Sequence, residues 1–470
     1  MLRRAAATAR HIRHASTTPH HVDAIVVGAG LVGVSTASNL AAAGLRVLCV
    51  TQHSPCSYTS AVSTECYRDF WPSLEMAALM SCSISLMEQT ARGASDAVGM
   101  TRRGYAYCAR NPENLAKAVA ECENLGQPVR HHHTTHAYEP SPAGILHAVD
   151  ALPTGFDVLH GDAAREAFPA LAEDVVGVVH ARRAGWVDSG RYADEIVSRA
   201  KAQGVTFLTG RLDAVECEGG EVSGVQVDGR FVKASAVVNC AGPHLKTVHA
   251  MVAAPELPVA NEVHAKVIFR DVLGTVPRNS PMLISLDPAR ILEDGAGLED
   301  VFGAATAAKL SRVAPSGVHL RPWGNEHLLL LWDYWHSDVD VGAPPVDVPE
   351  FDTDLYPEVC LRGLSGFLPG LREYTDGDGG ERPLIDGGYY TQTPENRPLI
   401  GPGGVPGYHI NGAFAGFGLM AAEAAGELCA AHVVESTLPS YAPALLPARY
   451  GDPAYAAVLE GLVARGSGSI

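Results

Sequence analysis

The sequence has no uninterrupted run of about 18 apolar residues, the length that a membrane-spanning helix needs. Even the apolar region near the C-terminus is broken by Glu423 and Glu427. A long run of lysine and arginine is also absent, and the formal net charge is −17 at pH 7. Because nucleic-acid phosphates are bound by basic surfaces, we expect no nucleic-acid partner and no membrane span.

Paired cysteines and clear metal-ligand spacings are missing as well. The ten cysteines are scattered without a CxxC pair, which favours a reducing compartment and mostly buried thiols. The histidines at 131–133 and His136 could suggest a metal site. However, neighbouring side chains on an extended chain point to opposite faces, and no carboxylate or cysteine stands at ligand spacing. We expect a solvated loop here and no metal.

Residues 1–21 have their own composition. They contain Arg3, Arg4, Arg10 and Arg13 with alanine, serine and threonine, and no acidic residue precedes Asp23. This is typical of a mitochondrial matrix-targeting segment that is removed after import; a disordered tail is the alternative. The apolar core of a secretory signal is missing. The sequence therefore predicts a mitochondrial matrix protein.

A strand, a glycine turn and a helix open the rest of the chain. An apolar strand at 24–27 runs into G-x-G-x-x-G, a helix follows until Gly44, and a second strand covers 46–50. In this context Gly28 permits the tight turn, Gly30 lets the backbone approach a pyrophosphate, and Gly33 allows helix and strand to pack closely. The motif predicts a dinucleotide site, with a close-packed turn as the structural alternative.

The acidic residue that usually binds the ribose at the end of the second strand is replaced. Thr51 and Gln52 stand at this position. Both side chains can hydrogen-bond a hydroxyl, but neither gives the charge-assisted bond of a carboxylate. We expect one of the two to hold the ribose, and no arginine follows that would favour a 2′-phosphate.

Four blocks carry a resemblance to a known family. GAGLVGVSTASNLAAAGLRVL, AVVNCAGPH, GYYTQTPENRPLIGP and YHINGAFAGFGLMAAEAAGEL follow one another between residues 23 and about 435. Together they resemble the ordered blocks of the D-amino-acid oxidase superfamily, in particular its sarcosine oxidase and dimethylglycine dehydrogenase branch. The resemblance implies FAD as cofactor, and a small amine or amino acid as substrate.

The resemblance also implies the fold: an α/β protein in which a Rossmann-like FAD domain of the glutathione-reductase type is interleaved with a mixed, mainly antiparallel β-sheet substrate domain. We assign 22–95, 189–250 and 384–440 to the FAD-binding domain, 96–188 and 251–383 to the substrate domain, and 441–470 to a C-terminal tail. Within this scheme 189–202 is expected to be a helix that begins at Asp188 or Ser189.

Further cofactor residues come with the resemblance. It implies that Ala241 and Gly242 return to the dinucleotide, and that a glycine-rich turn brings a helix N-terminus to the flavin, where the helix dipole would stabilise the anionic reduced ring. The predicted cofactor residues outside the first glycine motif are Thr51, Gln52, Ser60, Ser63, Thr64, Ala241, Gly242, Gly412, Gly416, Gly418 and Met420. Met420 replaces a family lysine, and Gly388 stands where related enzymes bond the flavin through cysteine, so we expect non-covalent FAD.

On the substrate side, the element from Thr64 to Arg68 resembles the segment that places an arginine against the substrate carboxylate. The alternative is that Arg68 pairs with Asp69 or Glu65 on a surface loop. Tyr390 stands where other branches have a carboxylate-binding arginine, which points to an N-methylated amine; alternatively it packs under the flavin. His264 completes the predicted catalytic residues, and Lys266 on the same strand is a further candidate for the pocket wall.

The resemblance implies hydride transfer from the α-carbon of the amine to flavin N5, after which electrons pass to oxygen or to a flavoprotein carrier. The segment 327–336 has no lysine of the kind that assists oxygen reduction in the family, which slightly favours a dehydrogenase over an oxidase. A second hypothesis is a flavin-binding assembly factor of a respiratory complex, with little or no catalysis.

Overall fold

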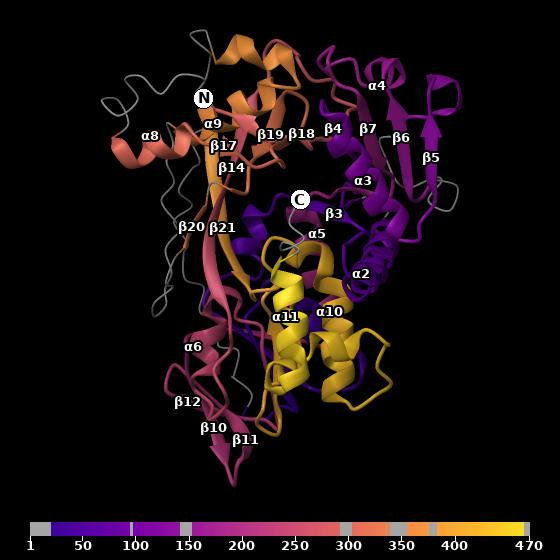
Figure 1. Cartoon of the computed structure of the whole chain (residues 1–470). Coiled ribbons are helices and arrows are strands. Elements are labelled where there is room, and N and C mark those ends of the chain that lie inside the picture. The colour runs from indigo at the N-terminus through magenta and orange to yellow at the C-terminus, as the bar shows by residue number, and fades with distance from the viewer. Residues whose placement is uncertain are drawn as a thin grey trace.

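The computed structural model describes residues 20–94, 97–141, 153–291, 303–334, 336–338, 355–375 and 383–464 (Figure 1). The predicted targeting segment lies outside these ranges except for His20 and His21. Among the described residues, no helix is both long and apolar enough to cross a membrane. All ten cysteines are described, and all are free thiols.

A six-stranded sheet forms the first layer of the fold. Its strand order is β22-β23-β13-β1-β2-β9, and every neighbouring pair is parallel except β22 and β23. The strands are β1 (Ala24–Val27), β2 (Val47–Thr51), β9 (Thr206–Thr209), β13 (Ala236–Asn239), β22 (Leu399–Pro402) and β23 (Tyr408–Gly412). The predicted βαβ opening is confirmed, because α1 (Leu31–Ala42) connects β1 to its parallel neighbour β2.

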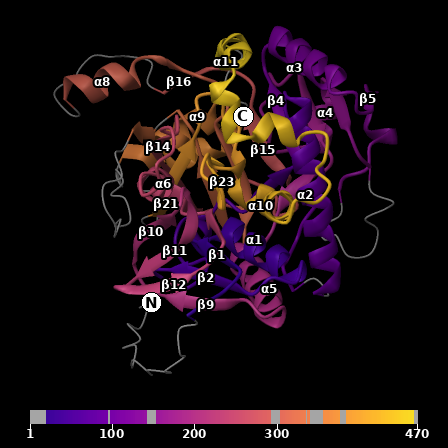
Figure 2. The same cartoon turned by 90° about the horizontal axis from the view of Figure 1, so that it is seen from below.

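Both faces of this sheet are covered. On one face α1 packs with α2 (Leu74–Gly93), α5 (Ser189–Ala202) and α10 (Gly418–Val433) in a shared apolar core. On the other face lie the antiparallel strands β10 (Leu212–Glu218), β11 (Glu221–Val227) and β12 (Arg230–Lys233), with α6 (Leu245–His249). Figure 2 shows these layers from below. The predicted start of α5 is confirmed: the Asp188 side chain accepts a hydrogen bond from Arg191 N at 3.0 Å.

The second layer is a ten-stranded sheet of order β20-β14-β19-β18-β15-β4-β7-β6-β5, with β21 paired to β14. It is mixed, since β4 with β15 and β5 with β6 are parallel and the other pairs antiparallel. Its strands are β4 (Tyr105–Ala109), β5 (Val129–His132), β6 (Phe156–His160), β7 (Gly177–Ala181), β14 (Ala260–Arg270), β15 (Met282–Ser285), β18 (His319–Trp323), β19 (His327–Leu331), β20 (His336–Asp338) and β21 (Leu384–Gln392). The predicted mixed α/β fold class is confirmed.

The long pair β14 and β21 matters most for the site. The two strands are antiparallel over nine residue pairs, from Ala260 with Gln392 to Ile268 with Leu384. Figure 1 shows them side by side, running from the upper sheet towards the lower half of the molecule. The segment 384–440, which the sequence assigns to the cofactor domain, therefore begins with a strand of the second sheet; the domain division itself stays a prediction.

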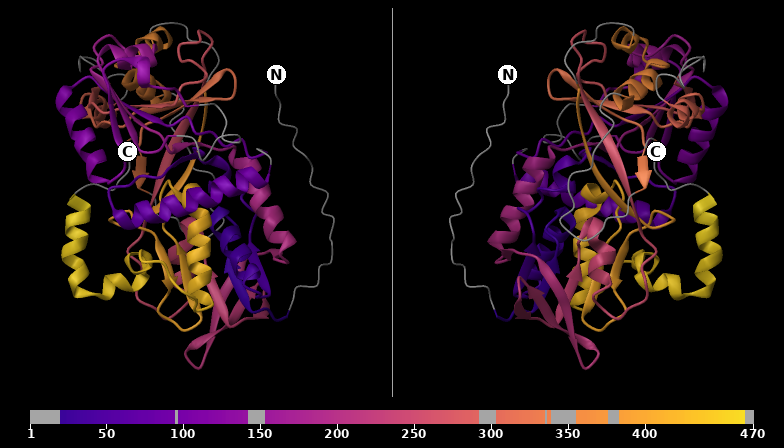
Figure 3. Two further views of the ribbon diagram at one scale, coloured as in Figure 1. Left: turned by 90° about the vertical axis from the view of Figure 1, so that its right-hand side faces the viewer. Right: turned by 90° about the vertical axis from the view of Figure 1, so that its left-hand side faces the viewer.

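Smaller elements complete the described chain. Two short strands, β3 (Cys66–Arg68) and β8 (Ala184–Trp186), pair with each other between the two sheets. The remaining elements are α3 (Pro112–Asn124), α4 (Asp162–Ala167), α8 (Ala304–Leu310), α9 (Leu355–Ser365), α11 (Pro453–Ala464), the strands β16 (Ala289–Arg290) and β17 (Val313–Ala314), and short 3-10 turns that include η1 (Thr59–Val62) and η4 (Gly242–His244). Helix α11 lies at the outside of the molecule (Figure 3).

The expectation of a solvated loop at the histidine cluster was wrong for 129–132, which form strand β5 of the second sheet. His132 is buried and its Nε2 lies 2.8 Å from Asp157 Oδ1, whereas the His133 ring stacks on His160 at 4.6 Å between centroids. Strand β5 pairs in parallel with β6, and its Val129 packs against a buried cluster that contains Phe156, Val158 and Val179. No group of three or more metal-binding side chains occurs in the ranges that the structure describes.

Candidate functional site

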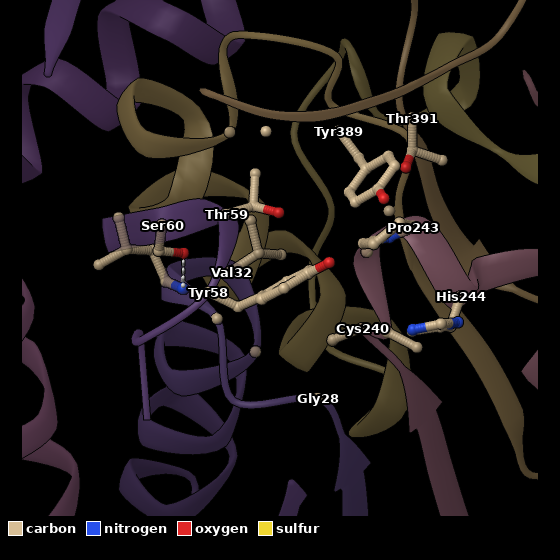
Figure 4. A pocket seen from close by; sticks show the side chains of 18 of the residues that line it. Gly28, Val32, Tyr58, Thr59, Ser60, Cys240, Pro243, His244, Tyr389 and Thr391 are labelled. Carbon is tan, nitrogen blue, oxygen red and sulfur yellow. Dashed lines mark hydrogen bonds between the residues drawn. The ribbon is translucent and has the colours of Figure 1, made fainter. Parts of the chain in front are cut away.

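A cavity of about 410 Å³ lies between the two sheets, within the size range of cofactor sites. The turns after β1, β2 and β13 and the turn before α10 form one side, and strands β14 and β21 form the other. Figure 4 shows the Tyr58 side chain extending across it, from the side of Val32 and Ser60 towards Cys240 and Pro243. One cavity thus joins both layers of the fold.

The turn from Gly28 to Gly33 forms part of one side of this cavity and is called the glycine cradle below. Glycine is required at two of its positions. A Cβ on Gly28, whose φ is +104°, would lie 2.3 Å from the carbonyl oxygen of Cys240, and a Cβ on Gly33 would lie 1.9 Å from that of Gly28. Both contacts are with backbone atoms that cannot move aside. The backbone of Gly30 lines the cavity, so a ligand can approach it closely.

Two helices begin at the cavity. Leu31 and Val32 of α1 and Gly418 and Leu419 of α10 line it, and neither helix has a side-chain cap or an acidic residue in its first turn. In α1 the Leu31 amide donates to Ser60 Oγ at 3.2 Å. Helix N-termini carry partial positive charge and free N–H groups. The two ends therefore suit a ligand with negative charge at two places, such as a pyrophosphate and an electron-rich ring.

Three polar atoms at the cavity are buried and have no hydrogen-bond partner among the described residues. They are Thr59 Oγ1, His244 Nδ1 and Asn411 Oδ1. Buried polar atoms are costly unless they are paired. This donor and acceptor set, together with the glycine cradle and the helix ends, fits a long polar cofactor of the dinucleotide type.

At the end of β2, the two residues predicted to hold the ribose differ in hydrogen bonding and exposure. The Thr51 hydroxyl donates to the carbonyl of His53 at 3.0 Å and is engaged within its own loop, whereas Gln52 is exposed; both line the cavity. Arg211 lines the same end, because the preceding Gly210 amide donates to the Thr51 carbonyl at 2.8 Å. Sequence reading missed Arg211, which is distant along the chain.

The structure brings most of the predicted site residues to this one cavity. Those that line it are Gly28, Gly30, Gly33, Thr51, Gln52, Ser60, Ser63, Thr64, Ala241, Gly242, His264, Tyr390, Gly412, Gly416 and Gly418. Met420 is not among them: it is buried in the apolar core around α10 and α2. The glycine-rich turn before α10 is strained, since Ala413 and Ala415 have positive φ.

Tyr390 and His264 form the wall opposite the glycine cradle. Their rings stack with centroids 3.9 Å apart and planes 12° from parallel, and they project from the paired strands β21 and β14. A Cβ on Gly416 would lie 2.6 Å from the Tyr390 ring, so this ring fills the space left by the glycine. Tyr390 is therefore fixed from both sides.

Two carboxylates hold His264. Its Nε2 lies 2.9 Å from Glu262 and its Nδ1 lies 3.6 Å from Asp333. Burial disfavours the imidazolium, but the two carboxylates of Asp333 and Glu262 outweigh it and raise the pKa of His264 to about 8. The imidazole is therefore mostly protonated at neutral pH, and it acts as a cation rather than as a base.

The structure excludes the surface-loop alternative for Arg68. This residue is 6% exposed, so it is not on a surface loop, and its neighbours Glu65 and Asp69 form ion pairs with Arg321 and Arg183. The Arg68 guanidinium lies 4.5 Å from the Trp71 ring centroid and donates to Tyr107 Oη at 3.4 Å. Arg68 is not among the residues that line the cavity. Its predicted role at the substrate carboxylate stays a prediction.

Lys266 lines the cavity from β14, on the same strand face as His264. The sequence named it as a further candidate for the pocket wall, on the same expected strand as His264. Its partner Asp386 was not foreseen, since the register of β14 with β21 joins residues that lie far apart in the sequence.

The family model described as FAD dependent oxidoreductase matches residues 23–432. Among solved structures, L-proline dehydrogenase from P. horikoshii is 19% identical, with a TM-score of 0.69 over 92% of this chain and 99% of that one. Glycine oxidase from Bacillus cereus is 15% identical, with a TM-score of 0.65 over 90% and 98%. Iminodiacetate oxidase from Chelativorans sp. BNC1 is 18% identical, with a TM-score of 0.64 over 90% and 98%.

Proposed function

Because the chain belongs to the family of FAD dependent oxidoreductases, we propose that it oxidises a small amine or amino acid, with an N-methylated amino acid of the sarcosine or dimethylglycine type as substrate. A single observation carries this proposal: one cavity is bounded by a dinucleotide cradle and, opposite it, by the Tyr390 and His264 wall. When bound, FAD supplies the two-electron acceptor. The names of three similar structures each specify a small amino acid.

The protein's own contribution is to position the substrate and exclude water. The rings of Tyr389 and Tyr390, with the side chain of Leu331, give the cavity an apolar wall on the side of the second sheet. Tyr390 cannot rotate freely, because His264 and Gly416 contact its two sides. A fixed aromatic wall holds an amine in one orientation at little entropic cost. Tyr390 in place of an arginine supports an N-alkylated amine as substrate.

The electron acceptor is proposed to be a flavoprotein carrier rather than oxygen, so that the enzyme works as a dehydrogenase. The support is that β19, whose residue Leu331 reaches the cavity, contains only one histidine and four leucines. In line with the composition of residues 1–21, we place this activity in the mitochondrial matrix.

The test is to mix the purified flavin-loaded protein with N-methyl amino acids, D-amino acids and simple amines in the absence of oxygen. We expect N-methyl amino acids to bleach the flavin absorbance, and an artificial acceptor to restore it faster than oxygen does. The variant Tyr390→Ala should keep its flavin and react more slowly. If no amine bleaches the flavin of the intact protein, the enzymatic proposal is wrong and the assembly-factor hypothesis takes its place.

A further inference from the structure

Lys266 is an unusual side chain to find in this cavity wall. It lies on β14, is 5% exposed, and lines the cavity together with His264. Lysine is almost never buried unless its charge is paired, because desolvation of an ammonium is costly. Its presence therefore calls for partners that compensate the buried charge.

Two partners hold the Lys266 ammonium. Its Nζ donates to the Val62 carbonyl at 2.6 Å, and it forms an ion pair with Asp386, its cross-strand neighbour in the register of β14 with β21. An ammonium has three N–H donors. Within the described parts of the chain, no third acceptor is found for Nζ. One donor of a buried cation is thus available at the cavity.

Near Lys266 two positively charged side chains line the cavity, and the carboxylates that pair with them lie behind. His264 and Lys266 line the cavity, whereas the carboxylates that balance them, Glu262, Asp333 and Asp386, are not among its lining residues. Glu65 and Arg321, which pair with each other, act on Lys266 with opposite signs. A ligand in this part of the cavity therefore lies nearer to the cationic side chains than to the carboxylates.

The other cations of the region are already engaged. Both ring nitrogens of His264 face carboxylates, so no N–H of this side chain remains for a ligand. The Arg68 guanidinium lies over Trp71 and Phe70. Arg211 lines the opposite end of the cavity, beside Thr51. Only Lys266 combines a buried charge, a cavity position and a donor without an acceptor among the described residues.

We propose that Lys266 binds the carboxylate of the substrate through its third N–H, and that it selects amino acids over plain amines. This inference rests on the proposed function for the identity of the substrate. It assigns the carboxylate to Lys266 instead of Arg68. The bond is charge-assisted and desolvated, which makes it strong and specific for an anion. Val62 and Asp386 fix the ammonium in position before the ligand arrives.

The experiment measures binding of acetate to the flavin-loaded protein by calorimetry, with acetamide as the uncharged analogue of the same shape. Lys266→Met should weaken acetate binding about tenfold to a hundredfold and leave acetamide binding unchanged, because only the anion uses the charge. Since methionine alone would leave the buried Asp386 carboxylate without its cation, the double variant Lys266→Met with Asp386→Asn is measured as well.

Lys246→Met is the matched control. Lys246 also forms an ion pair, with Glu256 at 2.9 Å, but its side chain is half-exposed and does not line this cavity. Its removal should leave acetate affinity unchanged. Melting temperature and flavin absorbance confirm that each variant is folded and loaded.

The inference is overturned by the absence of saturable acetate binding to the intact protein, by unchanged acetate affinity in a flavin-loaded Lys266 variant, or by loss of acetate binding in Arg68→Lys instead. A Lys266 variant that loses flavin affinity while still binding acetate would likewise overturn it, since the ammonium would then serve the cofactor. If no amine reacts but acetate binding depends on Lys266, the proposed oxidation fails while the anion site stands.

Discussion

The ring of Tyr390 stacks on the imidazole of His264 with centroids 3.9 Å apart, and the two side chains come from β21 and β14, which are paired neighbours in the second sheet. Two carboxylates keep this imidazole protonated at neutral pH, so the stack is also a contact between a cation and an aromatic face. The wall of the candidate substrate site is therefore held by electrostatics as well as by packing.

We predict that Gly416→Ala damages this wall. The new Cβ would lie 2.6 Å from the Tyr390 ring, which His264 holds from its other side, so the ring would have to leave its stacked position. The cost of such overpacking is about 1–3 kcal/mol of stability, together with a higher KM for the substrate. Urea unfolding and steady-state kinetics measure the two effects. Gly93→Ala is the control, since its Cβ meets no atom within 4 Å; equal behaviour of both variants would contradict the prediction.

A second prediction concerns stability and pH. The folded pKa of His264, about 8, is raised above the ordinary value of 6.5, so the protonated form stabilises the fold below pH 6.5 and this contribution is lost as the pH rises through 8. It amounts to about 2 kcal/mol. The free energy of unfolding, measured between pH 6 and pH 9, should fall over this window in the intact protein and change less in His264→Gln. A variant with the same pH profile would show that other groups are responsible.

We further predict that Gly33→Ala abolishes FAD binding. Its Cβ would stand 1.9 Å from the carbonyl oxygen of Gly28, and both atoms belong to the cradle under the cofactor. Because backbone must shift, the variant should purify colourless and unfold at a lower temperature. Flavin absorbance per protein measures the outcome. Gly461→Ala on helix α11, where nothing lies within 4 Å, should remain yellow. A fully loaded Gly33→Ala protein would mean that this turn does not hold the cofactor.

The fourth prediction is that the flavin is released by acid precipitation. Gly388 offers no thiol for a covalent bond, and burial raises the pKa of the nearby cavity thiols Cys56 and Cys240 to about 12, which keeps them protonated and unreactive. The yellow colour should therefore appear in the supernatant. Colour that stays with the precipitated protein would refute the prediction.

The cofactor side of the cavity could be predicted from the sequence, because the residues that form its glycine turn lie close together in the chain. The turn from Gly28 to Gly33 lies between a strand and a helix that are themselves local patterns, so the chain positions it without help from distant residues. The FAD assignment is confirmed by the family match over residues 23–432. Asp188 likewise marked the start of α5, since a helix cap acts within one turn.

The substrate half was harder, because it depends on the register of distant strands. That Lys266 meets Asp386, and His264 lies beside Tyr390, follows from the pairing of β14 with β21, which no local pattern encodes. Met420 was assigned to the cofactor by analogy of position, but it faces the core side of α10. Arg68 carries the expected charge, yet the rings of Phe70 and Trp71 determine where its guanidinium lies.

The cavity is lined by residues from both ends of the chain, from Val27 near the beginning to Leu419 near the end. Chains emerge from the ribosome N-terminal end first, so the strand of Tyr390 and the turn before α10 are among the last parts to appear. The first βαβ unit can fold early, but it then presents only part of the cavity lining. We therefore expect the complete FAD site to form only after the segment that contains Tyr390 and the turn before α10 has been synthesised.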